Sequence, residues 1–78
     1  MMNVIKTELK DVIAKALECD VESIHDDAGL SNHYNWDSLG QLAIMVALEE
    51  KYHIDINEHN ANQFLSLAQI IKYLENNA

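Results

Sequence analysis

The stretch WDSLGQLAIMVALEEKY, residues 36–52, decides the fold, because it predicts a helix with apolar side chains on two sides. At about 100° per residue, one side holds the stripe Ile44, Leu48 and Tyr52, with Gln41 and Met45 beside it. The other side holds Leu39, Leu42 and Val46, followed by Glu50. A small bundle has few helices with which to cover both stripes. We therefore expect the first stripe in the core and the second on the surface, where an apolar centre with Glu49 and Glu50 at its rim has the composition of a docking surface. The alternative is a central helix that its neighbours bury on both sides.

Two polar residues, Asp37 and Ser38, mark the start of this helix. Asp is a preferred N-cap, so we expect the helix to begin after Asp37. Ser38 is not placed as a nucleophile, because no G-x-S-x-G elbow surrounds it and no histidine is placed by the sequence as its base, although His25 or His33 could come near it in space. A helix N-terminus does favour an attached phosphate. The residues alone leave Ser38 as a capping residue, a nucleophile, or a site that another protein modifies.

The other helices follow from apolar residues at helical spacing. We expect an amphipathic helix over residues 4–18, and then an ordered loop over 19–36 that Val21, Ile24 and Leu30 pin to the core. A short turn of helix is expected at 58–63. Ser66 opens the last helix with capping-box spacing to Gln69, and its apolar stripe comprises Leu67, Ile70, Ile71 and Leu74. No segment carries a strong strand pattern, so the predicted fold class is all-α: a small three- to four-helix bundle with a long first loop, in a single domain of residues 1–78.

The charge of the chain limits its partners. Thirteen acidic residues against five basic ones give a formal net charge of −8. Nucleic acid and anionic membranes need a cationic surface, so we expect neither as a partner and expect proteins with basic surfaces instead. The charge also favours a soluble monomer. We see no secretory leader and no apolar run long enough to span a membrane, which predicts a cytoplasmic protein.

Metal chemistry is not expected. The single cysteine, Cys19, and four scattered histidines show no zinc spacing. His25, Asp26 and Asp27, with His33 nearby, lack an EF-hand pattern, and we interpret them as solvated loop residues. Trp36, next to the helix start, is expected to pack over the loop, and contact with a partner is the alternative.

The segment Asp37-Ser38-Leu39, with the apolar helix that ends Ala47-Leu48-Glu49-Glu50 and the Tyr52-His53-Ile54 that follows, resembles the acyl carrier proteins and related phosphopantetheine-binding carrier domains. The similarity extends along the chain, through the first amphipathic helix, the long loop and the last helix introduced by Ser66-Leu67. The "WDSLG" and "ALEEKY" motifs resemble in particular the free-standing bacterial carriers.

The resemblance implies a carrier rather than an enzyme. Ser38 would receive 4′-phosphopantetheine from coenzyme A through a separate phosphopantetheinyl transferase, and Asp37 would support the transfer. The arm's thiol would carry an acyl or aminoacyl group as a thioester between a loading ligase or synthase and the enzymes that accept the group. Leu39, Leu42, Val46, Glu49 and Glu50 match partner-contacting positions of the family.

The chain departs from the family's pattern in two ways. Acidic residues are frequent where this chain has Gly40 and Ala43, and a glycine is frequent where it has Asn35, a residue that can also adopt left-handed backbone angles. The first departure predicts poor exchange with generic fatty-acid synthase enzymes. The competing hypothesis is an unmodified acidic helical module for protein–protein interaction, in which Ser38 only caps its helix.

Overall fold

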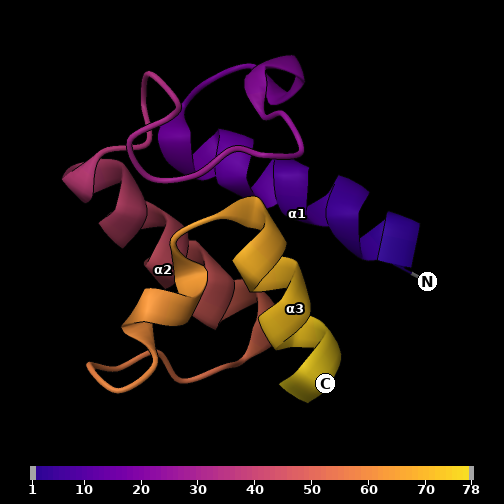
Figure 1. The fold of residues 1–78 in the computed structure, drawn as a ribbon, viewed down its shortest axis with the longest axis vertical. Coiled ribbons are helices and arrows are strands. Elements are labelled where there is room, and N and C mark those ends of the chain that lie inside the picture. Colours follow the sequence, from indigo (N-terminus) through magenta and orange to yellow (C-terminus); the bar gives the residue numbers. More distant parts are fainter. Residues whose placement is uncertain (1, 78) are drawn as a thin grey trace.

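The computed structural model describes residues 2–77, and its regular structure is helical throughout (Figure 1). Its elements are α1 (Met2–Leu17), η1 (Val21–Ser23), α2 (Ser38–Tyr52), η2 (Ala61–Phe64) and α3 (Leu67–Asn77), where η marks a 3-10 helix. Residues 2–77 contain no strand, only an isolated bridge between Gly29 and Ser66. The all-α prediction is confirmed. No helix in this range is long and apolar enough to cross a membrane.

All three main helices begin within two residues of their predicted starts, and α1 and α2 end within one residue of their predicted ends. α1 ends at Leu17, one residue early, because Glu18 turns to a left-handed φ of 55° and the Cys19 N–H donates to the carbonyl of Ala14 (3.0 Å). α2 ends where His53 takes the same left-handed φ of 55°. The turn expected at 58–63 lies later, as η2, where the fully buried Phe64 anchors it.

α1 holds the bundle together, because it packs against both α2 and α3. The core between these helices is fully apolar apart from Gln41, and its largest fully buried side chains are Trp36, Phe64, Leu9, Ile13, Ile24, Ile44, Leu48, Leu67 and Ile70. Ile44 and Leu48 of the predicted core stripe are therefore buried. The third member, Tyr52, is only half-buried, and its hydroxyl donates to Glu8 Oε1 (2.9 Å). Burial, with the Glu8 carboxylate beside it, raises the pKa of the Tyr52 phenol.

The long first loop is held to the opposite end of the chain by backbone hydrogen bonds. The Leu30 N–H donates to the carbonyl of Leu65 (2.8 Å), and the Leu67 N–H donates to the carbonyl of Ala28 (2.9 Å). Ile24 is buried as predicted, but the prediction for Leu30 is wrong, since its side chain is 36% exposed. The main chain of Leu30 does the pinning, so its side chain is free to face solvent.

The capping box at α3 forms only in part. Ser66 Oγ accepts from the Gln69 N–H (3.2 Å) as predicted. Gln69 Oε1, however, accepts from the N–H of Leu65 (3.0 Å), the residue before Ser66, and not from the N–H of Ser66 itself.

Candidate functional site

Ser38 is the first residue of α2, and its side chain is exposed. The N-cap is Asp37, whose Oδ1 accepts from the Gly40 N–H (2.9 Å). Within residues 2–77, neither the Ser38 hydroxyl nor the N–H groups of Ser38 and Leu39 have a hydrogen-bond partner. Asp37 therefore does the capping, and the Ser38 oxygen stands beside two N–H groups at the positive end of the helix.

His33 is occupied elsewhere and is not positioned as a base for Ser38. Its Nδ1 accepts from the Asn35 N–H (3.1 Å), and its Nε2 lies 2.9 Å from Ser23 Oγ. Its ring stacks on Tyr34, with centroids 4.4 Å apart. In the described part of the chain no hydrogen bond joins Ser38 to His33 or His25, so the geometry offers no nucleophile and base pair.

A buried polar network lies under the first turn of α2. The Trp36 Nε1–H donates to Gln41 Oε1 (2.6 Å), and Gln41 Nε2 donates to the carbonyl of Phe64 (2.8 Å). Trp36 is fully buried in the core, so it packs, as expected, and does not face a partner, and Gln41 is 7% exposed. We call the Trp36 indole, the Gln41 side-chain amide and the Phe64 carbonyl the Trp36 brace. Their hydrogen bonds connect the start of α2 to η2. The helical spacing of the sequence placed Gln41 beside the core stripe but did not predict the brace. A glutamine on the buried face of a helix was the signal that could have indicated a buried hydrogen-bond network.

Asn35 and Gly40 bring the loop and α2 into close contact. Asn35 is not in a left-handed conformation; instead its Nδ2 donates to the carbonyl of Leu17 (3.1 Å), at the end of α1. A Cβ at Gly40 would overlap the carbonyl oxygen of Asn35 and lie 2.6 Å from Leu17 Cδ2. Gly40 is thus required by close approach of the backbone.

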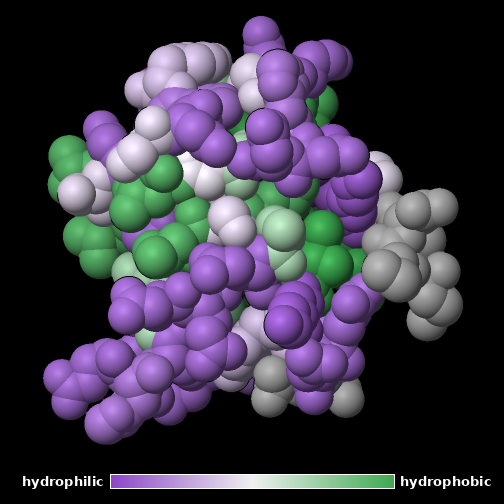
Figure 2. Space-filling model, in the orientation of Figure 1, coloured by the Kyte–Doolittle hydropathy of each residue, from purple (hydrophilic) through white to green (hydrophobic). Residues whose placement is uncertain are grey.

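The second stripe of α2 is exposed, as predicted, so the alternative of a helix buried on both sides is wrong. We call Leu39, Leu42 and Val46 the apolar strip; their side chains are 77%, 56% and 54% exposed. Figure 2 shows hydrophobic surface gathered where Figure 1 draws the start of α2. Of the two predicted rim acids, Glu50 is exposed, whereas Glu49 is half-buried and its Oε2 accepts from the Ile56 N–H (3.0 Å).

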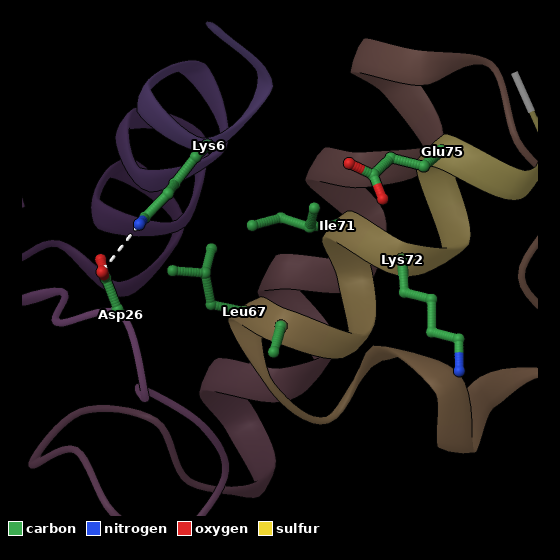
Figure 3. A pocket seen from close by; sticks show the side chains of 7 residues that line it. Lys6, Asp26, Leu67, Ile71, Lys72 and Glu75 are labelled. Atoms are coloured by element: carbon green, nitrogen blue, oxygen red, sulfur yellow. Dashed lines mark hydrogen bonds and ion pairs between the residues drawn. The ribbon is translucent and has the colours of Figure 1, made fainter. Parts of the chain in front are cut away.

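A groove of about 380 Å³ lies between α1, the first loop and α3, away from Ser38. Figure 3 shows Leu67 and Ile71 of α3 facing the ion pair between Lys6 and Asp26 across this groove. The ammonium groups of Lys10 and Lys6, each 2.7 Å from a carboxylate oxygen, lower the pKa of Asp26 to about 2. The carboxylate of Asp26 is therefore committed to ion pairs with Lys6 and Lys10. Residues 2–77 contain no group of three or more His, Cys, Asp and Glu side chains arranged to hold a metal ion.

Known proteins resemble the chain over nearly its whole length. The family model described as "Phosphopantetheine attachment site" matches residues 7–74. An acyl carrier protein of Helicobacter pylori (strain J99) is 30% identical over 70 residues, which cover 90% of each chain. That of Campylobacter curvus is 28% identical over 87% of this chain and 88% of its own, and that of Buchnera aphidicola is 29% identical over 96% of this chain and 95% of its own. The range that the family model matches includes all of α2, whose first residue is Ser38.

Proposed function

The chain belongs to the phosphopantetheine-binding carrier proteins, and we propose that Ser38 is the residue to which its prosthetic group is attached. Membership of this family implies 4′-phosphopantetheine as the prosthetic group and a carrier rather than an enzyme. It also implies a phosphopantetheinyl transferase and the enzymes of a pathway as partners. We take residues 1–78 as one carrier domain that acts in the cytoplasm.

The observation that carries the proposal is the state of the Ser38 hydroxyl. It is exposed, it makes no hydrogen bond within residues 2–77, and Asp37 has taken over the capping that would otherwise explain a serine here. The unpartnered N–H groups of Ser38 and Leu39 suit a phosphodiester, because a helix N-terminus stabilises an attached anion. The residues present therefore fit the prosthetic group that the family requires.

Attachment would use groups from this chain and from the transferase. The Ser38 oxygen would form a bond to the phosphorus of coenzyme A that carries the pantetheine, the pyrophosphate bond would break, and adenosine 3′,5′-bisphosphate would leave. The serine proton would pass to a base of the transferase. Asp37 Oδ1 is used by the Gly40 N–H, which leaves Oδ2 of this exposed carboxylate to support the transfer by contact with the transferase's magnesium ion. The bound group supplies a thiol that holds its cargo as a thioester.

We assign partner docking to the apolar strip, which begins one residue after Ser38, and to the exposed Glu50 at its far end. Glu49 would contribute only the part of its carboxylate that the Ile56 N–H leaves open. An apolar centre with a charged rim is the usual composition of a transient interface. The partners would be a loading ligase or synthase and the enzymes that accept the acyl or aminoacyl group, each with a basic docking surface that complements the net charge of −8.

The test is the intact mass of the protein after incubation with coenzyme A, magnesium and a broad-specificity phosphopantetheinyl transferase. We expect the mass to rise by one phosphopantetheine, and we expect Ser38→Ala to abolish the gain. Ser31→Ala, which removes another exposed serine from the loop, is the matched control and should be loaded as the unchanged protein is. A protein that stays unmodified would instead support the acidic interaction module, and turnover of an ester by the unloaded chain would support a hydrolase.

A further inference from the structure

The packing under Ser38 bears on what the protein carries. We propose that the cargo on the Ser38 arm stays outside the helical core and is therefore a short or polar acyl group rather than a long alkyl chain. This inference rests on the proposed attachment at Ser38. A thioester cargo can shelter only in a space that its arm can reach, so the space beside the first turn of α2 is the one that matters.

That space is filled by the Trp36 brace. Trp36 and Phe64 are fully buried, and Gln41 is 7% exposed. The two hydrogen bonds of the brace, at 2.6 and 2.8 Å, run from the residue two before Ser38, through the residue one turn after it, to η2. An alkyl chain that passed from Ser38 between α2 and η2 would have to displace the largest side chain of the protein.

The neighbouring end of the bundle is closed as well. The backbone bonds from Leu30 to Leu65 and from Leu67 to Ala28 tie the first loop to the junction of η2 and α3. Gly29 packs so closely there that a Cβ on it would lie 3.0 Å from both the carbonyl oxygen of Leu65 and the Cβ of Ser66. A path into the core from this side would break main-chain hydrogen bonds.

The balance of interactions opposes a buried chain. Each buried methylene gains a modest hydrophobic free energy. Displacing Gln41 would leave the Trp36 N–H and the Phe64 carbonyl buried without partners, and moving Trp36 aside would take the apolar surface of its fully buried side chain out of the core. Together these losses offset the gain from burying several methylenes. A short or polar cargo gains too little from burial to open the brace.

Outside the core, a groove next to Ser38 has a mixed lining that suits a polar group. It lies between the end of α1 and the start of α2, and its polar lining consists of Glu18, Asn35 and Asp37. Ala16, Leu17, Leu39 and Ala43 give it an apolar part that is smaller than the polar part. The groove can receive hydrogen-bond donors from a short cargo but offers no deep apolar cavity.

The experiment compares two cargoes on the full chain. The transferase is used to load acetyl- and octanoyl-pantetheine from the corresponding coenzyme A thioesters, and loading is verified by intact mass. Because Trp36 is the only tryptophan, its fluorescence reports directly on the brace. We expect the two loaded forms to have the same Tm and the same Trp36 emission maximum, and their thioesters to react with hydroxylamine at the same rate as free acyl-pantetheine. A higher Tm, a shifted emission or a several-fold protected thioester in the octanoyl form would overturn the inference.

The outcomes separate this inference from the proposed function. Failure to load Ser38 at all would overturn both, whereas loading followed by protection of octanoyl would overturn only the exclusion from the core. Gln41→Ala removes the centre of the brace and serves as the matched variant. In that variant we expect the octanoyl form to become more stable than the acetyl form. Equal stability of the two forms in Gln41→Ala would refute the brace as the cause of exclusion.

Discussion

Replacement of Gln41 by Leu is the most direct probe of the packing beneath Ser38. Leu keeps the helix, since its helix propensity is as good as that of Gln. It cannot accept from the Trp36 Nε1–H or donate to the carbonyl of Phe64, the two bonds that Gln41 makes. The change therefore isolates the polar part of the brace from its bulk.

The expected loss of stability follows from these two groups. Each would be left buried without a partner, at about 1–3 kcal/mol, or about 2–6 kcal/mol together. The buried Leu side chain returns about 1.5–3 kcal/mol. We expect Gln41→Leu to lower the free energy of unfolding by about 2 kcal/mol, which for a domain of this size lowers Tm by about 8–16 °C.

Urea unfolding followed by far-UV circular dichroism measures the change, and Trp36 fluorescence checks that the indole changes environment. Gln63→Leu, at an exposed glutamine of η2, is the matched control and should change stability by no more than about 0.5 kcal/mol. In the pair Trp36→Phe and Gln41→Leu, the double variant should lose less than the sum of the single losses, because they share one hydrogen bond. If Gln41→Leu is as stable as the unchanged protein, or if the losses simply add, the brace does not stabilise the start of α2.

Three further predictions concern the residues around the site and the first loop. Gly40→Ala should lower stability by about 1–3 kcal/mol in urea unfolding even though Ala is the better helix former, because its methyl group would overlap the carbonyl of Asn35; a gain in stability would contradict this contact. Asp37→Ala should cost about 0.5–2 kcal/mol through loss of the N-cap while Ser38→Ala changes stability little, and equal losses in thermal unfolding would mean that Ser38 shares the capping. Because the pKa of Asp26 is lowered from 3.8 to about 2, the stability from its ion pairs is present above pH about 4 and is lost as the pH falls to about 2. The gap between the urea midpoints of the unchanged protein and Asp26→Asn should therefore close over that range, and a gap that stayed constant with pH would exclude the ion pairs as its source.

The sequence predicted the features that depend on near neighbours in the chain. The start of α2 follows from Asp37, whose carboxylate caps an N–H three residues away. The exposed apolar strip follows from helical spacing together with the small number of helices available to cover it. The proposed attachment at Ser38 came from the resemblance to carrier domains, because local reasoning alone left this serine as a capping residue, a nucleophile or a site that another protein modifies.

The features that the sequence did not predict depend on contacts between distant residues. Leu30 looked like an apolar anchor, but its N–H holds the loop through a partner 35 residues away, so its side chain is not needed. The role of Gln41 depends on the carbonyl of Phe64, 23 residues away, and periodicity gives no information on backbone carbonyls. The carboxylate of Glu49 is likewise taken by the N–H of Ile56, which no charge pattern would reveal.

The contact between Gly40 and Asn35 gives the departures from the family's pattern at these two positions a common origin. The main chain at Asn35 occupies the volume that any side chain at position 40 would need, so an acidic residue there requires a different path of the loop. A glycine at position 35 is the residue best able to take such a path. The two sites are thus expected to have changed together during divergence of the lineage. An acidic residue introduced at position 40 of this chain would overlap the main chain of the loop at Asn35, even if its charge improved partner recognition.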